Sequence, residues 1–144
     1  MIPPTCHGVR SDAMGDGHFG ARRGDRTHKG TDWICYPGEP IVAPIYGKVV
    51  REAKPYSNDM HYNGVLIRNS IYSIKMFYCD PYFNIIGQYV RCGDPIGVAQ
   101  DISKKYEGPG KPAMTPHIHT QVEDNNGNLI DPETILEEVT RKFI

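Results

Sequence analysis

The sequence lacks several features that would place it in a common class of protein. No apolar run approaches the roughly 18 residues that a membrane-spanning helix needs, and no basic amphipathic helix of the kind that lies on a membrane is present. Lys and Arg total 16 against 17 Asp and Glu, so the net charge is −1 and the basic excess of a nucleic-acid-binding protein is missing. We therefore expect neither membrane insertion nor a nucleic-acid partner.

Further absences concern processing and cysteine spacing. The first four residues have neither the charged nor the apolar region of a signal peptide, and no Asn-x-Ser/Thr glycosylation site occurs. No Cys-x-x-Cys pair is present, which argues against a structural zinc cluster. The chain has four cysteines, Cys6, Cys35, Cys79 and Cys92. An even count in a small, loop-rich chain predicts two disulfides in a secreted, extracellular protein, with three pairings open and four buried free thiols as the alternative.

Glycine and proline are abundant and indicate the fold class. The 144 residues suit a single domain over residues 1–144, and 15 glycines with 12 prolines separate short β-branched runs. This pattern predicts an all-β fold of mainly antiparallel sheets. Residues 1–27, rich in glycine and poor in apolar side chains, are expected to be irregular. Strands are expected over residues 40–43, 48–53, 64–68, 72–79, 89–91, 96–100 and 117–122.

One short helix is expected at the C-terminus. Asp131 is a good N-cap and Pro132 suits the first helical position. The apolar face of this helix would consist of Ile135, Leu136, Val139 and Phe143.

Two short histidine motifs predict a metal site. His28 precedes Asp32 by four residues, and His117 and His119 share one face of a predicted strand, because side chains at i and i+2 point the same way. Zinc accepts imidazole nitrogen and carboxylate oxygen, and two histidines with one aspartate leave a fourth position open. Each motif alone is weak, since histidine and aspartate are common at protein surfaces.

These motifs also carry a family resemblance. Residues 27–32, 42–49, 116–119 and 127–132 resemble, in order and spacing, the M23 zinc metallopeptidases, which include lysostaphin-like enzymes. The resemblance implies that Zn²⁺ is the cofactor, that His28, Asp32 and His119 are its ligands, and that His117 is a catalytic histidine beside the metal.

A second resemblance lies within this family. Residues 28–35, 54–56 and 75–78 are similar to a branch of secreted animal proteins that are signalling ligands rather than enzymes. That branch implies a Cys6–Cys35 bridge, which would tie residues 1–27 to the domain and leaves Cys79 with Cys92. A bridge over such a loop would stabilise the fold by about 3–4 kcal/mol.

One position departs from the active enzymes. They carry a further histidine in a Tyr-x-His pattern, and here Asp80 follows Tyr78 at that place. An aspartate is ionised near pH 7 and would repel a developing oxyanion, although it could equally be a solvated turn residue before Pro81.

Three functions are therefore weighed. The favoured one is a secreted zinc-binding ligand for a cell-surface receptor, with an inactive peptidase fold. The others are an active zinc endopeptidase that cleaves glycine-rich or peptidoglycan peptides, and a cell-wall or glycan-binding module that keeps the groove without the chemistry. Arg23-Gly24-Asp25 matches an integrin-recognition tripeptide, a pattern short enough to recur by chance. The oligomeric state is left open.

Overall fold

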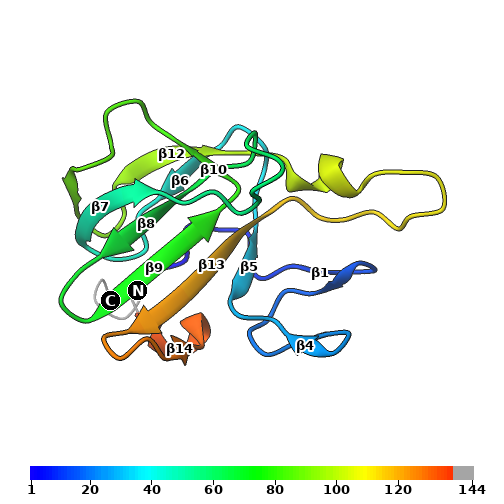
Figure 1. Ribbon diagram of the computed structural model, residues 1–144, viewed down its shortest axis with the longest axis horizontal. Helices are drawn as coiled ribbons and strands as arrows, with labels where there is room; N and C mark the ends of the chain where they lie inside the picture. The colour runs from blue at the N-terminus through cyan, green and yellow to red at the C-terminus, as the bar shows by residue number, and fades with distance from the viewer. Residues whose placement is uncertain (138–144) are drawn as a thin grey trace, which may run out of the picture.

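The protein is described by a computed structural model over residues 1–137, and a seven-stranded antiparallel sheet dominates it (Figure 1). The strand order is β11-β7-β8-β9-β13-β14, and β5 also pairs with β13. These strands are β5 (Thr31–Ile34), β7 (Gly47–Glu52), β8 (Gly64–Arg68), β9 (Tyr72–Phe77), β11 (Tyr89–Val90), β13 (His117–Asp124) and β14 (Leu129–Ile130). The all-β prediction is confirmed.

A smaller sheet completes the hydrophobic core. It has the order β10-β12-β6, with β6 (Pro40–Val42), β10 (Cys79–Pro81) and β12 (Pro95–Ala99). Ile41 and Ile96 from this sheet belong to the same buried cluster as Ile67, Ile74 and Val122 of the large sheet. These alternating β-branched residues put one face of each sheet into a shared core, as the period of two requires.

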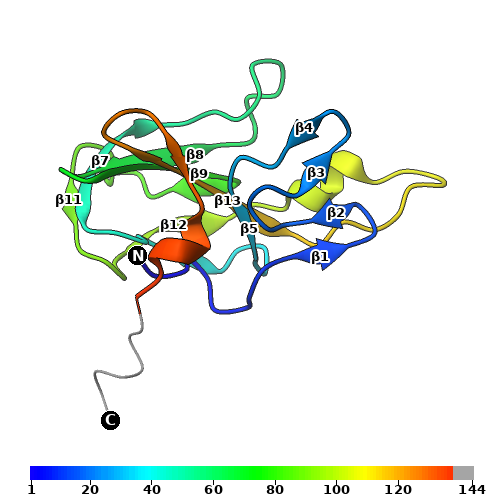
Figure 2. The ribbon, with the colours of Figure 1, turned by 90° about the horizontal axis from the view of Figure 1, so that it is seen from below.

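The N-terminal segment is more ordered than expected. It forms two small hairpins, one of β1 (Ser11–Asp12) with β2 (Gly15–Asp16) and one of β3 (Arg22–Arg23) with β4 (Arg26–Thr27). Figure 2 shows both hairpins side by side next to β5. The prediction of an irregular segment is therefore corrected: its glycines make the tight turns of hairpins, such as Gly24 with φ of 65°.

Two elements differ from the sequence-based expectation. The strand expected over residues 72–79 is broken at Tyr78, whose φ of 73° sends the chain from β9 into β10 of the other sheet. The C-terminal helix is a single 3₁₀ turn, η2 (Pro132–Ile135), after which Leu136 is extended. Asp131 does cap it, accepting a hydrogen bond from the Glu133 amide, whereas Val139 and Phe143 lie outside the described residues. Within residues 1–137 no helix is long and apolar enough to cross a membrane.

The cysteines also differ from the expectation. All four, which lie within the described residues, are free thiols, so neither the Cys6–Cys35 nor the Cys79–Cys92 bridge is present. Each expected pair would join an exposed thiol to a buried one: Cys6 and Cys92 are exposed, while Cys35 and Cys79 lie in the core. Burial raises the pKa of both core thiols to about 12, which makes them unreactive small apolar residues.

Candidate metal centre

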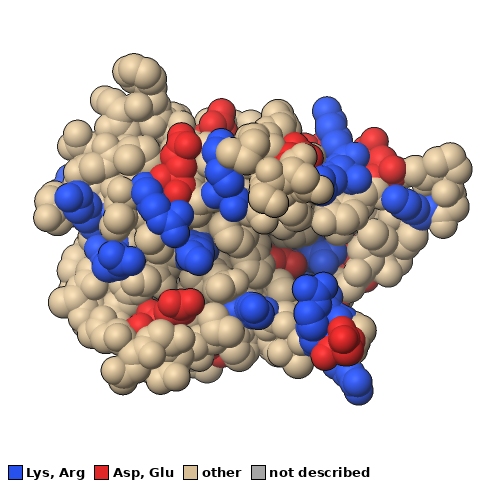
Figure 3. All heavy atoms as spheres, viewed as in Figure 1, with Lys and Arg blue, Asp and Glu red and all other residues tan. Residues whose placement is uncertain are grey.

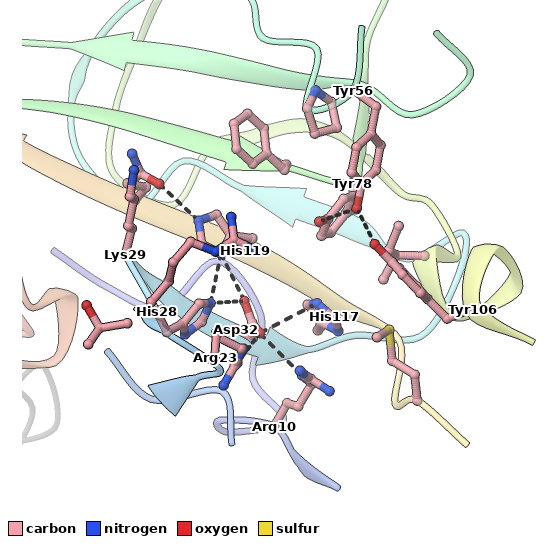
Figure 4. Close-up of a pocket in the computed structure, with 17 residues that line it drawn as sticks. Arg10, Arg23, His28, Lys29, Asp32, Tyr56, Tyr78, Tyr106, His117 and His119 are labelled. Carbon is pink, nitrogen blue, oxygen red and sulfur yellow. Dashed lines mark hydrogen bonds and ion pairs between the residues drawn. The ribbon is translucent and has the colours of Figure 1, made fainter. Parts of the chain in front are cut away.

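The paired strands β5 and β13 of the large sheet and the N-terminal segment bring His28, Asp32 and His119 together. Asp32 on β5 and His119 on β13 are directly opposite in the antiparallel register, and His28 follows β4. His28 Nε2 lies 3.2 Å from His119 Nδ1. Asp32 Oδ1 lies 3.1 Å from the first nitrogen and 3.0 Å from the second. The three atoms form a nearly equilateral triangle (Figure 4).

This triangle has the dimensions that zinc requires. Zn–N and Zn–O bonds of about 2.0–2.1 Å in a tetrahedral site place neighbouring ligand atoms about 3.3 Å apart. The observed separations of 3.0–3.2 Å are close to that value. Two imidazoles and one carboxylate are also the donor set that zinc accepts, with one position open. The three residues predicted as ligands therefore fit the ion.

Hydrogen bonds outside the triangle fix both imidazole tautomers. His28 Nδ1 donates to the carbonyl oxygen of His18 at 3.0 Å, and His119 Nε2 donates to Gln121 Oε1 at 3.2 Å. The proton is thereby held on the far nitrogen of each ring, and the near nitrogen keeps its lone pair for a metal. Such outer contacts orient metal ligands and raise their basicity.

Two arginines balance the charge of Asp32. Arg10, a nearly buried side chain, donates from Nε to Asp32 Oδ2 at 3.2 Å, and Arg23 Nη2 lies 3.8 Å from the same oxygen. Burial alone would raise the pKa of this carboxyl, but its contacts with the imidazoles of His119, His28 and His117 hold the pKa far below the usual range. Asp32 is therefore ionised and available as a ligand at neutral pH.

His117 stands beside the three donors without joining them. Its Nδ1 donates to the carbonyl oxygen of Thr115 at 2.8 Å, and its Nε2 lies 3.6 Å from Asp32 Oδ2. Burial lowers the pKa of His117 more than the charge of Asp32 raises it, so the ring is neutral near pH 7. A neutral imidazole with a free Nε2 can accept a proton.

The four side chains lie in an open cleft of about 530 Å³. Figure 3 shows the hollow, with Lys and Arg side chains around its mouth. Opposite the metal donors, Tyr56 Oη lies 3.1 Å from Tyr78 Oη and 2.9 Å from Tyr106 Oη. Tyr78 also packs edge-on against His117, with ring centroids 5.5 Å apart. The cleft thus has a cationic wall and a wall of phenolic hydroxyls (Figure 4).

Comparison with known proteins agrees with this geometry. The family model described as peptidase family M23 matches residues 26–132, which contain the three metal donors and His117. The chain belongs to peptidase family M23. Leukocyte cell-derived chemotaxin-2 of Bos taurus is 33% identical over 126 residues, which cover 87% of this chain and 76% of that protein. The Mus musculus protein of the same name is 30% identical over the same shares.

Solved structures show the same M23 fold. The catalytic domain of the antimicrobial peptidase lysostaphin from Staphylococcus simulans superposes with a TM-score of 0.59 at 24% identity, covering 83% of this chain and 88% of that one. A zinc-containing peptidase from Vibrio cholerae gives a TM-score of 0.60 at 25% identity, over 90% of this chain and 37% of that one. The likeness to lysostaphin establishes the fold alone. The likeness to the Vibrio cholerae peptidase covers a minor part of that longer chain.

Two other features singled out in the sequence, Asp80 and the Arg23-Gly24-Asp25 tripeptide, stand in different relations to the cleft. Asp80, which the Tyr-x-His comparison matched to a catalytic histidine of active enzymes, is exposed on β10 opposite Val98 and does not line the cleft. Within Arg23-Gly24-Asp25, the arginine donates to the carbonyl oxygen of Asp16 and faces Asp32. It therefore contributes to the cleft and is not displayed alongside the exposed Asp25.

Sequence reasoning missed several residues of this cleft. Arg10, Tyr56 and Tyr106 reach it from parts of the chain 22 or more residues from Asp32, the central donor. No local pattern marks them, because their roles depend on long-range pairing. The sequence did mark Tyr78 as part of the Tyr-x-His comparison, but gave no sign of its left-handed backbone.

Proposed function

We propose that this M23 protein is a zinc-binding extracellular signalling ligand that engages a cell-surface receptor and has lost peptidase activity. The observation that carries the proposal is the content of the cleft: beside the three metal donors it holds one further imidazole, that of His117. Active relatives of this fold use two.

The donor geometry supports zinc. His28, Asp32 and His119 would hold the ion, and bound zinc would supply Lewis acidity and a fixed double positive charge. The surrounding residues of this chain keep both imidazoles in the tautomer that a metal needs and keep Asp32 ionised. These features cost stability unless an ion is bound, because they bring three lone-pair donors within 3.2 Å of one another.

No other histidine replaces the missing one. His7 contacts Glu39 with Nε2 2.8 Å from Oε2, and His18 contacts Glu133 with Nδ1 2.5 Å from Oε1. His61 packs against Tyr62 with ring centroids 5.0 Å apart. Together with His28, His117 and His119 of the cleft, these three account for all six histidines of the chain. Losing one oxyanion donor typically lowers the rate by about 100–1000-fold.

The relatives support an extracellular signalling role. Two chemotaxin-2 proteins match 87% of this chain at 33% and 30% identity, and their name describes a chemotactic factor from leukocytes. A protein that keeps a metal centre but lacks part of the hydrolytic machinery can use the centre to order a binding surface instead. Here the ion would join the N-terminal segment, through His28, to the main sheet, through Asp32 and His119.

The test combines three measurements on the purified chain. We expect about one zinc per chain by elemental analysis, no hydrolysis of a pentaglycine peptide or of peptidoglycan above background, and saturable, trypsin-sensitive binding of labelled protein to leukocytes. A His119→Ala variant should lose the zinc and His61→Ala should keep it. Two results would contradict the proposal. One is purified protein without zinc, and the other is binding to cells that persists after the cells are treated with trypsin.

A working peptidase is the second candidate, and His117 is the observation that favours it. This ring is neutral, has a free Nε2 and faces an open cleft, so it retains the capacity of a general base. Hydrolysis by the unaltered protein that His117→Ala abolishes, with zinc content unchanged, would establish the peptidase and overturn the ligand proposal.

A further inference from the structure

The face of the large sheet on which the cleft opens carries a second feature, away from the metal donors. Side chains directly opposite in an antiparallel register point to the same face. Lys48 of β7 is opposite Arg68 of β8, and Lys75 of β9 lies two residues before Phe77, which is opposite His119. Lys75 is opposite Leu66 of β8, and Arg68 comes two residues after Leu66. Arg68 therefore lies on the same face as Lys75.

A β-bulge adds a fourth cation to this face. The register of β7 against β8 shifts between Val49 and Arg51, so that Arg51 lies opposite Leu66. Lys48 and Arg51 are three residues apart and would otherwise point to opposite faces. The bulge turns both toward the open face. We call Lys48, Arg51, Arg68 and Lys75 the basic track.

The basic track is free of carboxylate partners. Among residues 1–137, no Asp or Glu oxygen lies within 4 Å of a charged nitrogen of these four side chains, since none of them takes part in the ion pairs of the described chain. Arg68 Nε donates to Ser73 Oγ and Arg51 Nη1 to the Glu52 carbonyl oxygen. Figure 3 shows Lys and Arg side chains over the large sheet, with Asp and Glu side chains beside them. The four cations are therefore unpaired on a face that they share with Glu123, which is opposite Ser73 in the register.

The shape and spacing of the track indicate what it can bind. Cations on neighbouring strands are about 4.8 Å apart at the backbone, and a two-residue step adds about 7 Å, so the charges form a flat grid rather than a pocket. Cations spread over a flat surface suit a ligand with repeated anionic groups better than one compact anion. At one end the ring of Tyr89 is 80% exposed, with Lys48 Nζ 6.0 Å from its centroid, and offers a flat apolar surface to a sugar ring.

We propose that the basic track binds a sulfated polysaccharide of the extracellular matrix or cell surface. The choice of a polysaccharide rests on the extracellular location in the proposed function, whereas the anionic character of the ligand rests on the track itself. Repeated sulfate groups would each meet one of the four cations while the chain lies across β7, β8 and β9. The metal donors take no part in this contact.

The experiment measures binding of a heparin oligosaccharide to the full chain at about 0.15 M ionic strength, where weak surface electrostatics are screened. Lys48→Gln/Arg68→Gln removes two directly opposite cations of the track. Lys104→Gln/Lys111→Gln is the matched control, because both lysines are exposed in or after η1 (Ile102–Tyr106), beyond the cleft. We expect the track variant to bind at least about 10-fold more weakly and its log–log salt slope to fall by about two, with less than a 2-fold change in the control.

Several results would overturn the inference. They are the absence of saturable heparin binding, equal losses in both double variants, undiminished binding of desulfated heparin, and equally tight binding of single-stranded DNA of the same charge. A His119→Ala variant should keep its heparin affinity, and Lys48→Gln/Arg68→Gln should keep its zinc. The inference and the proposed function can therefore fail separately.

Discussion

The central strands and the N-terminal segment are held in place by different forces. In β7, β8, β9 and β13 the inward residues Val49, Ile67, Ile74 and Val122 are all 0% exposed, so hydrophobic burial fixes these strands. Residues 8–30 have strands of only two residues and are joined to the domain mainly by polar contacts. The segment contributes few side chains to the hydrophobic core, but it contributes Arg10, Arg23 and His28 to the cleft.

This contrast explains how the metal centre is assembled. Asp32 and His119 are placed by backbone pairing of β5 with β13, whereas His28 is placed by the polar segment and its hydrogen bond to the His18 carbonyl oxygen. Two donors are thus fixed on the sheet, and the third lies on a less buried segment. Metal binding would therefore couple the order of the segment to that of the sheet.

Loss of a donor from the sheet should have the largest effect. His119→Ala removes one of three ligands from a position where the backbone is fixed by pairing on both sides, so no neighbour can move in to replace it. We expect zinc to fall from about one per chain to background, with the far-ultraviolet circular dichroism of the sheet retained. Elemental analysis of dialysed protein measures this, and retention of stoichiometric zinc would refute the assigned ligand set.

Truncation in the core should be the next largest effect. Ile74 is fully buried in β9, and Ile74→Ala should lower the free energy of unfolding by about 2–5 kcal/mol through lost burial and a cavity. Urea denaturation of both proteins measures the difference. A matched change of an exposed residue, Ile71→Ala, should cost less than about 0.5 kcal/mol; equal losses would show that β9 is not part of the core.

Loss of the Asp12 carboxylate, which joins the N-terminal segment to the chain before β13, should have a smaller effect. Asp12 accepts hydrogen bonds from Arg10 and from the amides of Met14 and Thr115. Burial raises the pKa of Asp12, but these contacts outweigh it and hold the pKa below its usual value. We expect Asp12→Asn to lower the free energy of unfolding by about 1–3 kcal/mol at pH 7.

The pH dependence of that difference has a defined sign. Because the folded-state pKa of Asp12 is depressed, its contribution is fully present above the ordinary carboxyl pKa of 3.8 and is lost as pH falls through the folded-state value. The gap between wild type and Asp12→Asn should thus be constant from pH 7 to about pH 5 and narrow in more acid solution. Denaturant titrations at each pH measure it, and a gap that widens in acid would contradict the assignment.

The smallest effect is expected from restoring the sequence pattern of an active enzyme. Asp80→His recreates Tyr-x-His, but residue 80 is exposed on β10 and does not line the cleft. We expect peptide hydrolysis to stay at background, because a side chain at this position lies outside the cleft that holds His117. A gain of activity in a pentaglycine assay would show that β10 moves toward the cleft.

Local sequence patterns predicted several of the strands and the residues at the centre of the site. The expected strands over residues 64–68 and 117–122 appear as β8 and β13. A short apolar, β-branched run signals the buried strand β8, and alternation signals β13. The i, i+2 spacing correctly placed His117 and His119 on one face of β13. The N-cap role of Asp131 was likewise readable from its neighbours.

Long-range geometry decided the rest. The break at Tyr78, the approach of Arg10 to Asp32 and the burial of Cys35 and Cys79 apart from exposed Cys6 and Cys92 depend on which strands pair and where a chain leaves one sheet for another. The sequence by itself determined that strands form and which residues can bind a metal, since propensity and donor chemistry belong to single residues and short spacings. Only the tertiary structure decided that β5 and β13 bring Asp32 and His119 opposite each other, because strand register is set by the packing of the whole core.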